Sequence, residues 1–225
     1  MVTIKWLGHA TFEIDMADKI ILIDPFLKDN PQAAVKPSEI QKVDVMAVTH
    51  NHYDHFADTV EIAKKHDATV VAVYEAANAV TEQGVEKTVG LNIGGAAKID
   101  GLYITLTPAF HSCMSNPSGV ILSDGKISVY HAGDASIFSD MKLIGRMYKP
   151  RVALLPIGGF YTMGPLEAAM AAALIKPKVV IPHHYGTFDT IKHDPNEFVK
   201  FVRRKAKGVK VIVLKPGESY GLVYK

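Results

Sequence analysis

A cluster of metal-ligand side chains directly behind an apolar run constrains this chain more than any other feature. Residues 43–48 predict a buried strand, and the seven residues that follow read Thr-His-Asn-His-Tyr-Asp-His. Because this loop leaves a strand, His50 and His52 can share a metal, while Asp54 and His55 face a neighbouring point. Imidazole and carboxylate ligands suit Zn²⁺, Mn²⁺ or Fe. The alternative is a surface loop with chance histidines, which four ligand-type side chains within six positions disfavour.

The composition is that of a packed globular protein with nearly balanced charge. Of the 225 residues, 48% are hydrophobic, which argues against intrinsic disorder, and the length fits one or two domains. The 25 basic and 23 acidic residues leave a formal net charge of +2. This balance weakens the case for nucleic-acid binding through bulk electrostatics, although it leaves room for a local basic patch.

Cysteine usage and the apolar runs indicate where the chain works. The single cysteine, Cys113, cannot form an intramolecular disulfide, which excludes a disulfide-stapled secreted scaffold and fits a reducing compartment. It also favours imidazole–carboxylate over thiolate coordination. No apolar run approaches the length of about 20 residues that spans a bilayer, and the N-terminus lacks the pattern of a signal peptide. We therefore expect a cytoplasmic protein with no membrane segment.

The hydrophobic pattern predicts a mixed α/β chain that folds as one domain over residues 1–225. Helical spacing predicts helices over residues 59–66, 164–175 and 196–206, and a capping-box pattern predicts a helical turn from residue 38. Residues 49–56 are expected to form a polar loop. Apolar runs predict strands over residues 2–7, 11–16, 19–24, 43–48, 69–73, 102–107, 119–122, 127–130, 152–155, 179–181, 209–214 and 219–224.

The pattern of residues 50–55 resembles the HxHxDH signature of the metallo-β-lactamase superfamily. Three further residues match the later motifs of that family in the expected order, each at the end of an apolar strand: His111, Asp134 and His184. The resemblance covers essentially the whole chain. It implies the metallo-β-lactamase fold, a four-layer αβ/βα sandwich, with a dinuclear metal site at one edge of the β-sandwich.

The same resemblance implies two divalent metal ions, with Zn²⁺ favoured and Mn²⁺, Fe or Ni as alternatives. The implied ligands are His50, His52 and His111 for the first ion, Asp54, His55 and His184 for the second, and Asp134 for both. One departure from the family pattern is His183, which stands beside His184. Neighbours in an extended segment point to opposite sides, so only one of the two should reach the ions, and the His-Tyr motif assigns His184.

Several further residues are candidates for contacts around the ligands. Asp54, as a ligand beside a metal-bound water, is the candidate catalytic residue that orients the water and passes on its proton. Asp24 is expected to hydrogen-bond ligand histidines, because metal-bound imidazoles need such partners. His9 is a candidate for supporting a ligand or contacting substrate, with a turn cap as the equal alternative. His131 and His183 are weaker candidates for support, and a purely structural histidine is the preferred reading of His131.

Three segments point to a branch of the family. Residues 6–12, Trp-Leu-Gly-His-Ala-Thr-Phe, resemble the opening of the lactonase-like branch that includes ascorbate-6-phosphate lactonase. Residues 162–165 and 184–188 resemble an uncharacterised group often called metal-dependent hydrolases. The resemblance therefore implies an enzyme, a dinuclear metal-dependent hydrolase acting on a small anionic ester, lactone or phosphoester.

Two other functions stay open as alternatives. One is an RNA or DNA phosphodiesterase, but nucleases of this family carry an RNA-recruiting arm or inserted domain, for which 225 residues leave little room. The other is a non-catalytic metal-binding protein, which would be expected to lose ligands, and none is missing here. We thus expect a small-molecule substrate, no membrane and no nucleic acid as partners, and leave a homo-oligomer open.

Overall fold

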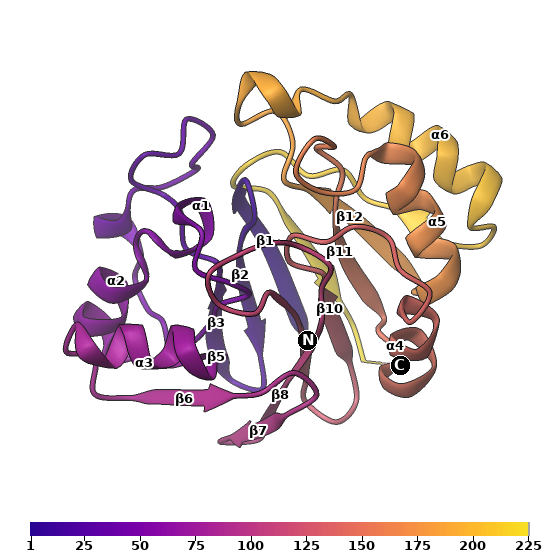
Figure 1. The fold of residues 1–225 in the computed structure, drawn as a ribbon. Helices are drawn as coiled ribbons and strands as arrows, with labels where there is room; N and C mark the ends of the chain where they lie inside the picture. The colour runs from indigo at the N-terminus through magenta and orange to yellow at the C-terminus, as the bar shows by residue number, and fades with distance from the viewer. Residues whose placement is uncertain (225) are drawn as a thin grey trace.

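The computed structural model describes residues 1–224, in which two β-sheets pack face to face with helices on both outer sides (Figure 1). Lys225, the last residue of the predicted domain, lies outside the described residues. In order across the first sheet, the strands are β14 (Ser219–Leu222), β1 (Val2–Gly8), β2 (Thr11–Met16), β3 (Lys19–Ile23), β4 (Val45–Ala47), β5 (Thr69–Val73) and β6 (Thr88–Leu91). In order across the second, they are β13 (Lys210–Val211), β12 (Val179–His183), β11 (Val152–Pro156), β10 (Ser128–His131), β9 (Ser118–Ser123), β8 (Leu102–Pro108) and β7 (Ala96–Ile99).

The helices divide between the two outer faces (Figure 1). Those beside the first sheet are α1 (Tyr53–Phe56), α2 (Thr59–His66) and α3 (Tyr74–Glu82). Those beside the second are α4 (Met141–Tyr148), α5 (Pro165–Ile175) and α6 (Pro195–Lys205). Two short 3₁₀ turns, η1 (Pro37–Glu39) and η2 (Asp189–Ile191), complete the elements of residues 1–224. This arrangement confirms the predicted four-layer sandwich.

Each sheet is half antiparallel and half parallel, and the sequence pattern of its strands follows this division. Strands β14, β1, β2 and β3 pair antiparallel, while β3, β4, β5 and β6 pair parallel. In β1 the buried residues Val2, Ile4 and Trp6 alternate with partly exposed ones. The parallel strands β11 and β12 are buried along their whole length, because helices cover one face and the other sheet covers the second.

Most predicted elements are confirmed, and the differences have local causes. Helix α2 has the predicted bounds, and α5 and α6 agree within one residue at each end. The prediction of a loop over residues 49–56 is wrong in its second half, which forms the single turn α1. Helices α3 and α4 and strands β6 and β7 are not among the predicted elements. Helix α3 follows β5 without a turn and has no side-chain cap, so no turn-forming or capping residue in the sequence marks its start.

The chain segments that carry the predicted site residues leave the sheets at one end of the sandwich. Thr49 and His50 follow β4, Asp134 follows β10, and His184 follows β12. The tight turn between β1 and β2 places His9 at the same end. No helix within residues 1–224 has the length and apolar character needed to cross a membrane.

Candidate metal centre

Three imidazoles from two sheets meet in the first group of the candidate centre. His50 Nε2 and His111 Nε2 each lie 3.1 Å from His52 Nδ1. Zn–N bonds of about 2.0–2.1 Å in a tetrahedron place two ligand nitrogens roughly 3.3 Å apart. The three ring nitrogens therefore have the spacing that one tetrahedral ion requires.

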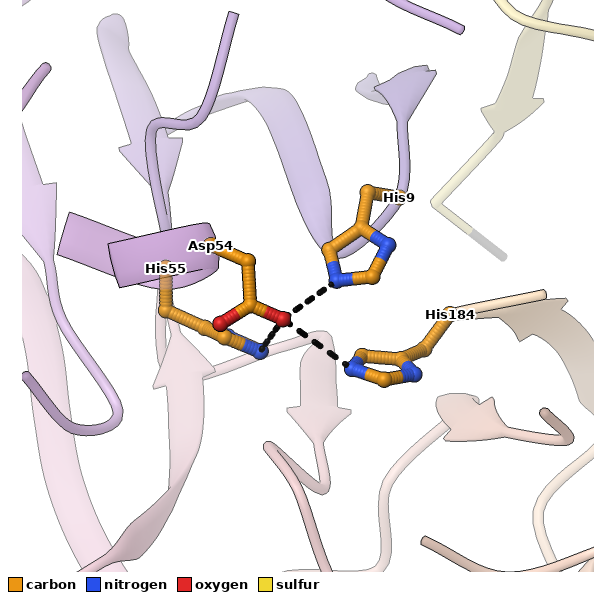
Figure 2. Close-up of side chains that lie close together, drawn as sticks. All are labelled: His9, Asp54, His55 and His184. Carbon is orange, nitrogen blue, oxygen red and sulfur yellow. Dashed lines mark hydrogen bonds and ion pairs between the residues drawn. The ribbon is translucent and has the colours of Figure 1, made fainter. Parts of the chain in front are cut away.

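A second group lies beside the first and is built around Asp54. Figure 2 shows the rings of His9, His55 and His184 directed towards the carboxylate of Asp54. Asp54 Oδ2 is 3.8 Å from His55 Nε2 and 3.7 Å from His184 Nε2. The turn α1 places Asp54 and His55 next to each other, while His184 has a positive φ of 54° at the end of β12. The helical turn missed by the sequence pattern thus orients two of the predicted ligands.

Asp134 lies between the two groups and presents one oxygen to each. Its Oδ1 is 3.2 Å from both His55 Nε2 and His184 Nε2. Its Oδ2 is 3.6 Å from His111 Nε2 and 4.0 Å from His50 Nε2. This is the position that a carboxylate shared by two cations would occupy.

Gly133 allows the chain to bring Asp134 to this place. It has a positive φ of 62°, and a β-carbon at this position would lie 2.5 Å from the carbonyl oxygen of Ser118. Only glycine combines this backbone conformation with so close an approach. A glycine directly before Asp134 therefore has a steric reason in this structure.

The polar atoms at the centre of the two groups fit divalent cations. His55 Nε2, His184 Nε2 and Asp134 Oδ1 are buried and have no hydrogen-bond partner among the described residues. Buried polar atoms without partners are rare in native proteins, because their desolvation is not compensated. Cations bound between these atoms would compensate it, and the imidazole–carboxylate donors are those that Zn²⁺, Mn²⁺ and Fe accept.

Asp24 links two of the candidate ligand histidines, His50 and His55, through hydrogen bonds on the side of their rings away from the centre. It is fully buried at the end of β3, and its Oδ2 accepts hydrogen bonds from His55 Nδ1 at 2.8 Å and from Thr49 Oγ1 at 2.6 Å. Thr49 Oγ1 in turn accepts from His50 Nδ1 at 3.0 Å. With Nδ1–H used in this way, the Nε2 lone pairs of both rings face the centre. The expected contact between Asp24 and a candidate ligand is therefore present.

His9 also contacts the centre and does more than cap a turn. Its Nε2 lies 3.0 Å from Asp54 Oδ2, and its Nδ1 lies 2.8 Å from Thr187 Oγ1. The backbone oxygen of His9 accepts hydrogen bonds from Trp6 Nε1 at 2.9 Å and from the backbone N–H of His184 at 3.0 Å. The left-handed backbone of His9, with φ 51°, makes both sets of contacts compatible.

His131 and His183 lie behind the centre and take part in neither group. His131 Nε2 donates to the carbonyl of Ala10, and its Nδ1 accepts from the N–H of Gly133, each at 3.0 Å. The ring of His183 lies against that of His131, with centroids 4.5 Å apart, and its nitrogens have no hydrogen-bond partner among residues 1–224. His131 thus supports the Gly133 turn, and His183 and His184 point to different environments.

The surroundings favour positive charge between Asp54 and Asp134. Burial lowers the pKa of His184, but the carboxylates of Asp134 and Asp54 outweigh burial and raise that pKa to about 9. Burial raises the pKa of the Asp54 carboxyl, yet its contacts with His184 and His9 bring it well below the ordinary value. By contrast, burial and the neighbouring imidazoles lower the pKa of His50 to about 3. That ring is therefore uncharged at neutral pH and can offer a nitrogen lone pair to a metal ion.

A cavity of about 410 Å³ opens onto the candidate centre. It is lined by His52, Tyr53, Asp54, His111, Asp134, Tyr161, Phe188 and Thr190. Three aromatic side chains form its rim and are 62%, 52% and 38% exposed, namely Tyr53, Tyr161 and Phe188. No lysine or arginine is among the lining residues. Tyr53 and Phe188 lie within the motif segments 50–55 and 184–188, but nothing in the sequence marks them or Thr190 as cavity residues, and only the fold brings them to this place.

Comparisons with known proteins agree with this geometry. The family model described as a beta-lactamase superfamily domain matches residues 3–184, which include every candidate ligand. A UPF0173 metal-dependent hydrolase of Methanopyrus kandleri is 49% identical over 227 residues, covering 96% of this chain and 98% of its own length. A homologue of the same name from Pyrococcus abyssi is 50% identical over 232 residues, covering 99% of this chain and 100% of its own.

A solved structure gives the same result. Igni18, described as a novel metallo hydrolase from Ignicoccus hospitalis, superimposes with a TM-score of 0.93 at 40% identity, covering 100% of this chain and 99% of its own. The names of these relatives support an enzyme that hydrolyses its substrate with the help of a divalent metal. The chain therefore belongs to the metallo-β-lactamase superfamily, among the UPF0173 metal-dependent hydrolases.

Proposed function

We propose that this protein is a dinuclear metal-dependent hydrolase that cleaves a small anionic ester, lactone or phosphoester. The observation that carries the proposal is the position of Asp134, whose two carboxylate oxygens face two separate groups of ligand-type atoms. When bound, two divalent ions would supply a hydroxide nucleophile at neutral pH and polarise the substrate oxygen. We favour Zn²⁺, with Mn²⁺, Fe or Ni as alternatives.

The proposed ligands divide between the two ions by position. His50, His52 and His111 would hold one ion, Asp54, His55 and His184 the other, and Asp134 both. Among the proposed ligands, Asp54 combines two further properties. It lines the cavity, and its Oδ2 contacts His9, a histidine that is not a proposed ligand. We therefore assign Asp54 the role of orienting the metal-bound water and passing on its proton.

The cavity limits the substrate. Its volume of about 410 Å³ suits a small molecule, and the aromatic rim suits an apolar group on that molecule. Because no lysine or arginine lines it, only the metal ions would balance negative charge on the substrate. A lactone, a carboxylic ester or a singly charged phosphodiester fits better than a phosphomonoester or a nucleic-acid strand. The resemblance of residues 6–12 to lactonases supports the lactone among these.

A metal analysis combined with a hydrolysis screen tests the proposal. The purified protein should contain two divalent ions per chain and cleave at least one member of a panel of lactones, esters and phosphodiesters. Asp54→Ala should abolish that activity, whereas Asp189→Ala, an exposed change of the same kind near the cavity, should retain it. Metal-loaded protein that cleaves nothing in the panel would support a non-catalytic metal-binding protein instead.

A further inference from the structure

Positive charge gathers around a second cavity, which nothing in the proposed reaction uses. This cavity of about 920 Å³ lies where α4 and α5 end and where β10, β11 and β12 begin. Seven of the 25 basic residues of the chain line it, and no acidic residue does. These seven are Lys126, Lys142, Arg146, Lys149, Arg151, Lys176 and Lys178. We call it the basic cavity.

The basic cavity lies at the opposite end of the second sheet from the candidate metal centre. Arg151 precedes β11 and Lys178 precedes β12, whereas His184 follows the far end of β12. A strand of five residues such as β12 spans about 16 Å, so the two sites are separate. Figure 1 shows α4 at the end of the sheet that is remote from α1.

The charges around the basic cavity are not neutralised by the protein. None of the seven side chains forms an ion pair within residues 1–224, where the Lys–carboxylate pairs involve other lysines. The ammonium of Lys126 lies over the ring of Tyr224, 5.7 Å from its centroid. Mutual repulsion among unpaired cations is unfavourable. A bound anion would remove it.

The ends of two helices explain only part of this charge. Lys149 and Lys176 follow α4 and α5 with left-handed φ angles of 44° and 57°, and Arg146 lies in the last turn of α4. Cations at these positions interact favourably with the helix dipoles. Interaction with the C-terminal end of a helix dipole does not explain the other four basic residues, Lys126, Lys142, Arg151 and Lys178.

We infer that the basic cavity binds a small ligand that carries two or more phosphate groups. Guanidinium and ammonium groups that line one cavity can bind several phosphates at once. Pro150, Leu174 and Ile175 line part of the wall and would contact an apolar portion of the ligand. The charge surrounds a cavity and the net charge is only +2, which favours a compact ligand over a nucleic-acid strand. This inference does not rest on the proposed hydrolase function.

Calorimetric titration of the metal-loaded protein with inorganic tripolyphosphate tests the inference. We expect binding of one tripolyphosphate per chain, with inorganic phosphate at least roughly tenfold weaker because it engages fewer cations. The double variant Lys142→Glu/Arg146→Glu should weaken tripolyphosphate binding by at least about tenfold. Both residues are exposed on α4, so the changes leave the core intact.

The matched control is Lys36→Glu/Lys64→Glu, which changes the net charge equally at two exposed, unpaired positions beside the first sheet. It should bind tripolyphosphate like the unchanged protein. Binding that persists in the α4 variant would place the ligand at the metal centre and overturn the inference, as would no binding at all. A single-stranded RNA oligomer that binds the unchanged protein more tightly than tripolyphosphate, and loses this in the α4 variant, would assign the cavity to nucleic acid instead. Should the α4 variant not fold, as judged by circular dichroism, Lys126→Gln/Lys178→Gln takes its place with the same expected loss.

Discussion

At the scale of single residues, Asp24 has the widest influence on the candidate centre. One buried carboxylate fixes His55 directly and His50 through Thr49, so two rings from one segment share a single anchor. Burial raises the pKa of Asp24, but His55 outweighs this and the pKa lies below its ordinary value. The carboxylate is therefore charged, and it determines which nitrogen of His55 carries the proton.

Asp24→Asn tests this control of the tautomer. The substitution preserves shape, but an amide has only one accepting oxygen, so either His55 Nδ1 or the backbone N–H of Thr49 faces an amide nitrogen and loses its acceptor. We expect metal affinity to fall by roughly 10–100-fold, the usual effect of removing a partner of a ligating histidine. Competition with a chromophoric chelator measures it. An unchanged affinity would show that the orientation of His55 does not depend on Asp24.

The adjacent histidines His183 and His184, at the end of β12 and directly after it, give a second test at this scale. His184→Gln should reduce the metal content to one ion or none, because His184 Nε2 lies 3.2 Å from Asp134 Oδ1. His183→Gln is the matched control and should retain both ions, since its ring packs against His131. Metal analysis by mass spectrometry distinguishes the two variants. Loss of metal only in His183→Gln would reverse the assignment.

At the scale of elements, the sequence predicts which strands exist better than it predicts how the chain turns between them. The apolar runs of β5 and β11 and the spacing in α2 identify these elements because burial determines their pattern. The turn α1 was not predictable, since its four residues are too few to show a helical period. It nevertheless decides the geometry of the site, because it brings Asp54 and His55 side by side.

Gly145 in α4 gives a prediction in which two effects oppose each other. Alanine favours an exposed helix interior over glycine by about 1 kcal/mol. Here, however, a β-carbon would lie 2.2 Å from the backbone oxygen of Ile175, so α4 and α5 would have to separate. Overpacking of this kind costs about 1–3 kcal/mol. We expect Gly145→Ala to lower the free energy of unfolding in urea, while Arg146→Ala on the same helix changes it little.

The connection between β3 and β4 predicts a pH dependence of stability. Burial raises the pKa of Asp44, but the backbone N–H of Ile20, at 2.8 Å, and Lys42, at 2.9 Å, outweigh it and lower the pKa. A lowered folded-state pKa contributes stability above the unfolded pKa of about 3.9, and this is lost as the pH falls through the folded value. Asp44→Asn should therefore destabilise the protein at pH 7 and less so at pH 3. A difference that stays constant with pH would contradict this.

At the scale of the whole molecule, the candidate centre joins the two halves of the sandwich. The first sheet and its helices provide His50, His52, Asp54 and His55, and the second sheet provides His111, Asp134 and His184. The order of these residues could be recognised from the sequence because the family motifs follow strand ends. The aromatic rim and the basic cavity could not, since their residues come from separate segments with no shared pattern.

This division predicts that the ions hold the two sheets together. If the two metal ions bind as a single event and are present at about 100 times the dissociation constant, their binding stabilises the folded state by about 2.7 kcal/mol. For a chain of this length each kcal/mol corresponds to about 2–4 °C, so chelation should lower the melting temperature by roughly 5–10 °C. Zn²⁺ should restore it. The variant Asp134→Asn should melt at a lower temperature with zinc and respond less to chelator, because it lacks the carboxylate that faces both groups. If chelation removes the metal and the melting temperature stays the same, the sheets are held by their apolar contacts alone, and the ions serve only the chemistry of the cavity.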